Sequence, residues 1–129
     1  MLDHVTLRVP DLAVSAAFYE LVLGTLGIEI SVRGNNYVEW DLFAIALANV
    51  ETRMMTAAPP TQGLHIAFVA RSREHVDEFW RVGTEAGYRD NGAPGERVVY
   101  GGGYYAAFVL DPDGNNVEAV HHRSARTGI

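Results

Sequence analysis

The chain lacks cysteine altogether, which excludes disulfide bonds and thiolate metal ligands. It also lacks lysine, so its 10 basic residues are all arginines, set against 16 acidic residues for a formal net charge of −6. Because phosphate groups are bound by clustered cations, this balance argues against nucleic acid and anionic membranes as partners. No apolar run approaches membrane-spanning length, and the N-terminus has no basic-then-apolar leader. We therefore expect a cytoplasmic protein.

What is present is an ordinary globular composition, with 48% hydrophobic and 20% charged residues in 129. A chain of this length is most simply one domain, covering residues 1–129, and can bury a proper core. Within it, residues 4–9 (HVTLRV) resemble residues 65–70 (HIAFVA), about half a chain length later. The pair Phe18-Tyr19 recurs in the same way as Phe79-Trp80. The repeat predicts two similar modules, approximately residues 1–50 and 63–123, packed on each other.

The pattern within each half predicts the order βαβββ. Apolar residues at helical spacing predict helices over 12–23 and 74–86, with Asp11 and Ser72 as N-caps. In the first helix the apolar residues at helical spacing are Val14, Ala17, Phe18, Leu21 and Val22. Alternation and turn residues predict strands over 2–9, 28–32, 37–40, 43–48, 64–69, 104–110 and 116–121, with another beginning at Tyr88. Strands that pair within each half, with helices on one face only, make an α+β protein.

Two stretches lack such periodicity. Residues 49–63 carry Pro59-Pro60 and are expected to link the halves. Residues 90–103 are rich in glycine and are expected to form a long loop. Because that loop lacks the strand-to-helix context of a phosphate loop, a mobile lid is the better functional interpretation and a simple connection the plainer one.

Three side chains form a candidate metal site. His4 and His65 occupy matched positions on the polar faces of the two opening strands, and Glu118 faces away from its apolar neighbours Val117 and Ala119. A single histidine on a strand is more often structural or exposed, but the repeat places two imidazoles at equivalent points. Two imidazoles and one carboxylate suit a divalent metal with open positions, such as Fe, Mn, Ni, Co or Zn. The sequence does not select among these metals.

Several of these segments resemble one known family. Residues 4–12 (HVTLRVPDL), Phe18-Tyr19, Leu23-Gly24, residues 63–68 (GLHIAF) and residues 108–118 (FVLDPDGNNVE) are similar to segments of the vicinal oxygen chelate superfamily. This superfamily is also called the glyoxalase, bleomycin-resistance and extradiol-dioxygenase group. The resemblance implies two βαβββ modules forming a cupped mixed sheet around a metal, with helices on the outer face. It also implies a homodimer, and it matches His4, His65 and Glu118 one by one with the family's ligand positions.

One family ligand has no counterpart here. Glyoxalase I carries a fourth protein ligand, a glutamate on the last strand of the first half. Aligning Asp41 with Asp113 puts Ala46 at that position, and alanine cannot bind a metal. Glu39 lies on the preceding strand and would need a different register. The three-ligand set is closer to the dioxygenase arrangement and disfavours a glyoxalase I reaction.

Other side chains are candidates for chemistry or binding. We expect Glu118 and Tyr105 to be catalytic, and the substrate to be contacted by Thr6, Arg8, Tyr37, Trp40 and Tyr104. For Arg8, pairing with a carboxylate at the end of the sheet is slightly favoured over binding an anionic substrate. Only one of Tyr104 and Tyr105 can face the cup, because they are adjacent on a strand. His122 shares the side of Glu118, but the end of a strand is usually solvated.

The function predicted from these features is a divalent-metal-dependent enzyme that acts on a small oxygenated organic molecule. Lyase, isomerase and dioxygenase chemistry remain open. The alternative is a metal-free protein of the bleomycin-resistance type, which sequesters a drug or another small molecule. A thiol transferase of the fosfomycin-resistance type is a third possibility, although the sequence shows few of the converging cations that a phosphonate pocket needs. No nucleic acid and no membrane is expected as partner.

Overall fold

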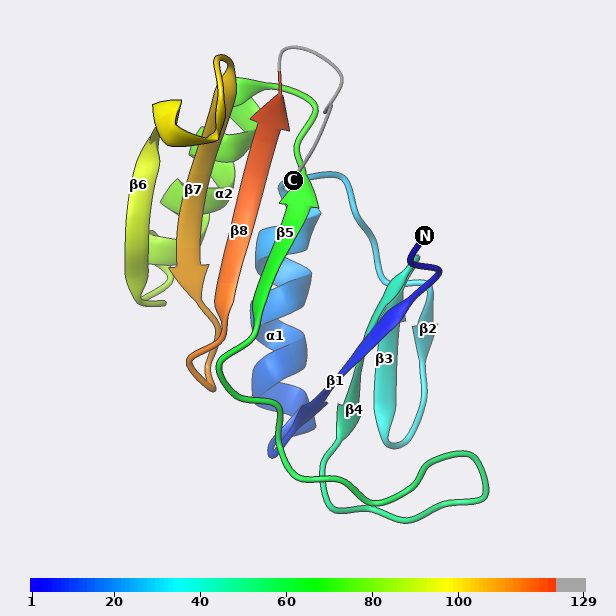
Figure 1. The fold of residues 1–129 in the computed structure, drawn as a ribbon. Coiled ribbons are helices and arrows are strands. Elements are labelled where there is room, and N and C mark those ends of the chain that lie inside the picture. The colour runs from blue at the N-terminus through cyan, green and yellow to red at the C-terminus, as the bar shows by residue number, and fades with distance from the viewer. Residues whose placement is uncertain (123–129) are drawn as a thin grey trace.

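The structure of this chain is a computed structural model, and it describes residues 1–122 (Figure 1). The predicted end of the second module at residue 123 lies outside that range. The elements follow one another as β1 (Val5–Val9), α1 (Leu12–Gly24), β2 (Val32–Arg33), β3 (Tyr37–Trp40), β4 (Phe43–Leu47), β5 (His65–Val69), α2 (Arg73–Glu85), β6 (Asp90–Glu96), a 3-10 turn (Val98–Tyr100), β7 (Tyr104–Leu110) and β8 (Asn116–His122). Within residues 1–122, neither helix has the length and apolar character needed to cross a bilayer.

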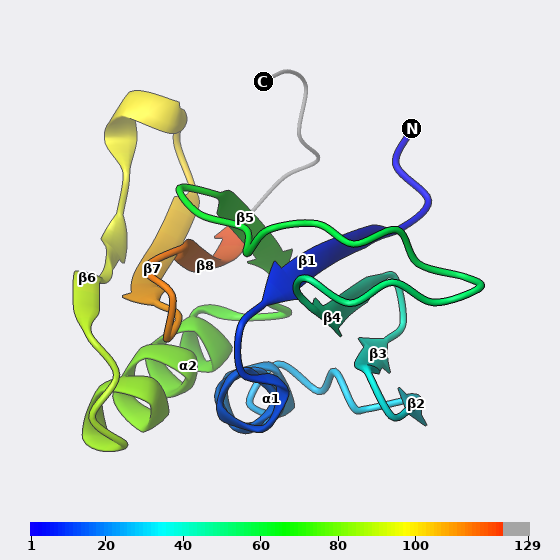
Figure 2. The same cartoon turned by 90° about the horizontal axis from the view of Figure 1, so that it is seen from below.

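The strands form two four-stranded mixed sheets, ordered β1-β4-β3-β2 and β5-β8-β7-β6. In each sheet the first and last strands of the module pair in parallel, and the other pairs are antiparallel. The predicted α+β fold of two βαβββ modules is confirmed. Figure 2 shows both helices on one side of the two sheets, with β1 and β5 between the rest of the strands. These two strands are the edges of their sheets.

The inner faces of both sheets meet the helices in one hydrophobic core. Leu7 and Val9 of β1 are buried against α1, and Phe79 of α2 is buried under the second sheet. Phe43 of β4 and Phe68 of β5 contact each other edge to face, with ring centroids 5.2 Å apart. This contact joins the two modules through the core. The opposite faces of the sheets are therefore left for function.

Helix α1 buries Phe18 and Val22 of the apolar pattern seen in the sequence, but its buried face is shifted from the rest of that pattern. Val14 and Leu21 are exposed, whereas Ser15 and Tyr19 are buried. The reason lies in the turn between β7 and β8, because the Tyr19 hydroxyl donates to Asp111 at 2.6 Å. Burial and the charge of Asp111 together hold the pKa of Tyr19 well above its usual range. The predicted N-caps of both helices are confirmed, with Asp11 accepting from the Val14 N–H and Ser72 from the His75 N–H.

The prediction of a long loop over residues 90–103 is wrong for residues 90–96. Residues 90–96 form strand β6, which pairs with β7 through two irregularities in register. Glycine permits the close packing there, since a Cβ at Gly92 would lie 2.8 Å from the Phe108 ring. Only the segment around the short turn Val98–Tyr100 remains outside the sheet. A lid as long as the sequence suggested is therefore excluded.

The turn before β8 is held by two buried side chains. The Asp111 carboxylate accepts hydrogen bonds from the backbone N–H groups of Asp113 and Asn115, both at 2.9 Å. The Asn115 amide accepts from the Leu64 N–H at 2.9 Å and donates to the Thr61 carbonyl at 3.1 Å. Asn115 thus ties the residue before β5 to the start of β8. The distinctive motif of this turn aligns the strand that carries His65 with the strand that carries Glu118.

Candidate functional site

Each sheet turns one face away from the helices, and these open faces carry most of the predicted site residues. On the second sheet the parallel register pairs Ala67 with Glu118, so His65 and Glu118 share the open face. On the first sheet the register pairs Thr6 with Ala44 and Arg8 with Ala46. His4, one step before β1, follows the parity of Thr6 and Arg8. The predicted strand faces are confirmed by the burial of the alternate residues, Leu7 and Val9.

Glu118 is the centre of a polar cluster on the second sheet. Its side chain is only 2% exposed, although it carries a carboxylate on the open face of β8. The His65 Nε2 lies 2.7 Å from its Oε1, and the Tyr104 hydroxyl donates to its Oε2. His65 is the accessible member, with 55% of its side chain exposed. The Glu118 carboxylate is therefore oriented by the Tyr104 hydroxyl and contacts the accessible His65 imidazole. A carboxylate and an imidazole are both groups that commonly bind metal ions in proteins.

His4 does not join this pair within one chain. Its side chain is 72% exposed and contacts Asp3, with Nδ1 and Oδ1 2.9 Å apart. Figure 1 shows why: β1 runs down from the N-terminus, whereas β5 runs up, so their first residues lie at opposite ends. Among residues 1–122, no three histidine, aspartate or glutamate side chains gather closely enough to hold a metal ion. One chain brings together two of the three predicted ligands.

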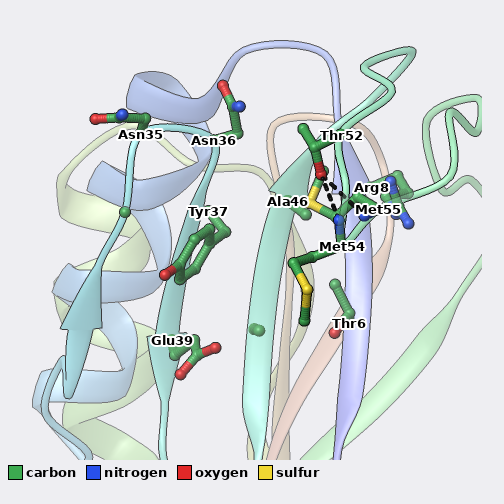
Figure 3. A pocket seen from close by; sticks show the side chains of 12 residues that line it. Thr6, Arg8, Asn35, Asn36, Tyr37, Glu39, Ala46, Thr52, Met54 and Met55 are labelled. Carbon is green, nitrogen blue, oxygen red and sulfur yellow. Dashed lines mark hydrogen bonds between the residues drawn. The ribbon is translucent and has the colours of Figure 1, made fainter.

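The open face of the first sheet forms a cavity of about 730 Å³ (Figure 3). The alanines Ala44 and Ala46 of β4 are its floor. Thr6 and Arg8 of β1 line one side, and Tyr37 and Glu39 of β3 line the other. The remaining lining residues belong to the β2–β3 turn and to the linker: Gly34, Asn35, Asn36, Thr52, Met54 and Met55.

The linker covers this cavity as an organised loop. Its two ends are joined by a hydrogen bond from the Asn49 N–H to the Ala58 carbonyl at 2.7 Å. Within it, the Thr52 hydroxyl accepts from the N–H groups of Met54 and Met55, at 3.2 and 2.9 Å. Its returning end pairs with β1, since Arg8 and Thr61 exchange hydrogen bonds at 2.8 Å. The segment expected only to link the modules is a lid held at both ends over the first sheet.

Two predicted site residues lie on the wrong side of their strands for the predicted role. Trp40, expected to contact the substrate, is fully buried in the core beside Tyr19 and Phe43. Tyr105, expected to be catalytic, faces α2 and donates to Asp77 at 2.6 Å, and this bond raises the pKa of Tyr105. Its neighbour Tyr104 has the opposite parity and contacts Glu118 instead.

Among the other candidates, Thr6, Arg8 and Tyr37 line the cavity, but Tyr104 lies on the other sheet. The slight preference for a carboxylate partner of Arg8 is not borne out, since its guanidinium forms no ion pair or hydrogen bond with the described residues. His122 contacts the Tyr104 ring, with centroids 4.7 Å apart.

The counterpart of Glu118 in the first module is Ala44 rather than Ala46. Glu118 pairs with Ala67, and the position equivalent to Ala67 in the first module is Thr6, which pairs with Ala44. The alignment of Asp41 with Asp113 failed because the turn before β4 is shorter than the turn before β8. The conclusion is unchanged, since alanine supplies no ligand. Glu39 lies in the same row across the sheet, paired with Ala44.

Several cavity residues could not be identified from the sequence. In the sequence, Glu39 is a candidate only for metal binding and Asn36 only for a turn, and Met54 and Met55 belong to no recognised motif. A visible feature was the Met54-Met55 pair inside an otherwise polar linker, because methionine is frequent at adaptable binding surfaces. A linker anchored at both ends to one sheet could not be predicted from local pattern.

Comparison with known proteins gives consistent matches over nearly the whole chain. Residues 1–119 match the model of the Glyoxalase/Bleomycin resistance protein/Dioxygenase superfamily. The protein YqjT of Bacillus subtilis, described as uncharacterized, is 31% identical over 124 residues, which are 92% of this chain and 97% of that protein. A glyoxalase/bleomycin resistance protein from Albidiferax ferrireducens has a similar structure, with a TM-score of 0.73 and 32% identity over 93% of this chain and 98% of that one. A putative glyoxalase from Bacillus halodurans also has a similar structure, with a TM-score of 0.65 and 30% sequence identity. The match covers 94% of this chain and 95% of that one.

Proposed function

Because the chain belongs to the glyoxalase/bleomycin resistance protein/dioxygenase superfamily, we propose that it is a divalent-metal-dependent enzyme acting on a small oxygenated organic substrate. The observation that carries the proposal is the pair formed by the buried Glu118 carboxylate and the accessible His65 imidazole. These donors suit Fe, Mn, Ni, Co or Zn. The chemistry is of the lyase, isomerase or dioxygenase type.

The third ligand in this proposal is His4 of a second copy of the chain. His4 and His65 start strands that run in opposite directions, so one chain cannot bring them together. Both strands are sheet edges, and an edge strand can pair with another chain. A twofold dimer in which the first sheet of one copy faces the second sheet of the other would create two equivalent cups.

The chain's own residues have separate tasks in such a cup. His65, Glu118 and His4 would hold the ion, which supplies a Lewis acid for an oxygen of the substrate. Tyr104 holds Glu118 by one oxygen and leaves the other toward His65. The cavity over the first sheet, lined on one side by residues 52–55 of the lid, would hold the rest of the substrate.

A metal-free binding protein is the second candidate, favoured by one observation. His65 and Glu118 satisfy each other directly at 2.7 Å, so the pair is a stable arrangement without an ion. In this alternative the same cavity sequesters a drug or another small molecule. Metal content separates the two candidates.

Metal analysis of the full chain, purified without chelator, tests the proposal. We expect close to one divalent ion per chain, and a His65→Ala variant that retains none after desalting. His75→Ala is the matched control, because the His75 ring lies in the first turn of α2, where it contacts the N-cap Ser72 rather than His65 or Glu118. Wild-type protein that neither contains a divalent metal nor binds one when it is supplied would establish the sequestering alternative.

The neighbouring tyrosines give a second prediction. Tyr104→Phe should weaken metal affinity by about tenfold or more, because the Glu118 carboxylate loses the hydrogen bond that orients it. Tyr105→Phe removes an equivalent bond to Asp77 on the other face and should leave metal affinity unchanged. Competition titration with a metal-binding dye measures both variants. Equal effects of the two substitutions would contradict a positioning role for Tyr104.

A further inference from the structure

The cavity over the first sheet has two charged lining residues, Arg8 and Glu39, and neither forms an ion pair with another residue among 1–122. We propose that it binds a small organic monocarboxylate, with Arg8 as the residue that holds the carboxylate. The inference rests on the proposed function, since this cavity would be the substrate-holding half of the same cup, and it names the chemical class of the substrate.

Arg8 carries the first part of the argument. Arg8 lines the cavity, and no carboxylate among residues 1–122 lies within ion-pair distance of its guanidinium. A partly buried cation without an anionic partner is unfavourable, so native proteins pair such groups. The planar guanidinium matches a carboxylate through two parallel hydrogen bonds. A ligand carboxylate supplies what Arg8 lacks.

The floor of the cavity determines the shape of the ligand's body. Arg8, Ala46 and Tyr37 form one row across three strands, so Arg8 and Tyr37 stand roughly 10 Å apart on either side of a methyl group. Tyr37 forms a fixed wall, because its ring packs so closely on Gly34 that a Cβ there would lie 2.3 Å away. Met54 and Met55 complete the lining from the lid. A cavity of about 730 Å³ with this lining has room for a small, largely apolar body such as one aromatic ring.

Glu39 limits the number of negative charges on the ligand. It stands in the next row, opposite Thr6 and across Ala44, and forms no ion pair with the described residues. The cavity therefore has a cationic corner at Arg8 and an anionic corner diagonally across. A second carboxylate at the far end of the ligand would meet the charge of Glu39. The lining selects a monocarboxylate.

Binding measurements with benzoate, its neutral analogue benzamide, and the dicarboxylate terephthalate test this proposal. Ligand-observed NMR or calorimetry on the full chain, with and without chelator, should show saturable benzoate binding. Benzamide and terephthalate should bind about tenfold more weakly or worse, because one lacks the charge that pairs with Arg8 and the other meets Glu39. Equal binding of benzoate and benzamide, or no benzoate binding at millimolar concentration, would overturn it.

Variants assign the effect to residues. Arg8→Gln should lower benzoate affinity by about tenfold or more, whereas Arg33→Gln, which removes an exposed arginine paired with Glu20, should not. Ala44→Leu should narrow the cavity and weaken benzoate binding, with the circular dichroism spectrum unchanged. Glu39→Gln should let terephthalate bind. An Arg8→Gln variant that binds benzoate like wild type would contradict the assignment.

The same experiment separates this inference from the proposed function. Benzoate affinity should be the same with and without chelator, because Arg8 rather than a metal ion holds the carboxylate in this assignment. If benzoate fails to bind while wild type holds its metal, the carboxylate assignment fails and the metal-dependent function stands. If benzoate binds through Arg8 but no metal is held, the cavity assignment stands and the metal proposal fails.

Discussion

Asp111→Ala is expected to be the most destabilising single substitution in this chain, with a loss of about 3–5 kcal/mol in the free energy of unfolding. The carboxylate is 4% exposed and accepts from four donors: the Tyr19 hydroxyl, the Asp113 and Asn115 N–H groups, and the Asn115 amide. Removing it leaves these donors buried without an acceptor. Because a domain of this size has about 5–15 kcal/mol in total, the variant should be marginally folded. Urea unfolding measures the loss.

Asp113→Ala is the matched control in the same turn. Its side chain accepts one long hydrogen bond, from Ser15 at 3.4 Å, and burial with the nearby charge of Asp111 raises the pKa of Asp113. Removing this carboxylate takes away a repulsion as well as a contact, so the change should stay within about 1 kcal/mol. Similar losses for the two aspartates would mean that the hydrogen-bond network of Asp111 does not hold the turn.

The strand faces could be predicted from the sequence because they follow from alternation. Leu7 and Val9 alternate with Thr6 and Arg8, and the buried and open faces of β1 follow that order. The contact between His65 and Glu118 follows from the same rule once β5 and β8 pair in parallel. The local pattern therefore contained the fold of each module and half of the candidate metal site.

Where two similar residues are adjacent on a strand, alternation alone does not tell which of them faces the site. Tyr104 and Tyr105 have the same chemistry, and only the register of β7 against β8 assigns Tyr104 to the Glu118 face. Strand β6 could not be predicted from the sequence because it is rich in glycine. Strand propensity reflects how side chains pack on a sheet, and glycine has no side chain. The register of β4 was misplaced by two residues because the two turns used for alignment differ in length.

The relative orientation of the two modules could not be predicted from the sequence, for a different reason. A repeat shows that two halves share a fold, but not which ends of their first strands lie together. The structure shows β1 and β5 running in opposite directions, so the matched histidines are distant in one chain. What looked like one site within a chain becomes, in our proposal, two sites shared between two chains.

Mixing two defective variants should restore metal binding, and this is the second large effect. His4→Ala and His65→Ala proteins should each lose metal affinity by about a hundredfold, since each dimer lacks one ligand in both sites. When they are unfolded together and refolded, about half of the dimers should contain one chain of each kind. In such a dimer, one site combines the intact His4 of one chain with the intact His65 and Glu118 of the other.

The restored fraction discriminates between the two arrangements. A site shared between chains predicts that about a quarter of all sites recover, because one site in each mixed dimer has every ligand. A site within one chain predicts no recovery, since every chain then carries a lesion. Cobalt(II) bound per chain, measured after desalting, gives this fraction directly. Mixing His65→Ala with Glu118→Ala is the control, because both ligands lie on β5 and β8 of the same chain and no combination of these variants rebuilds a site.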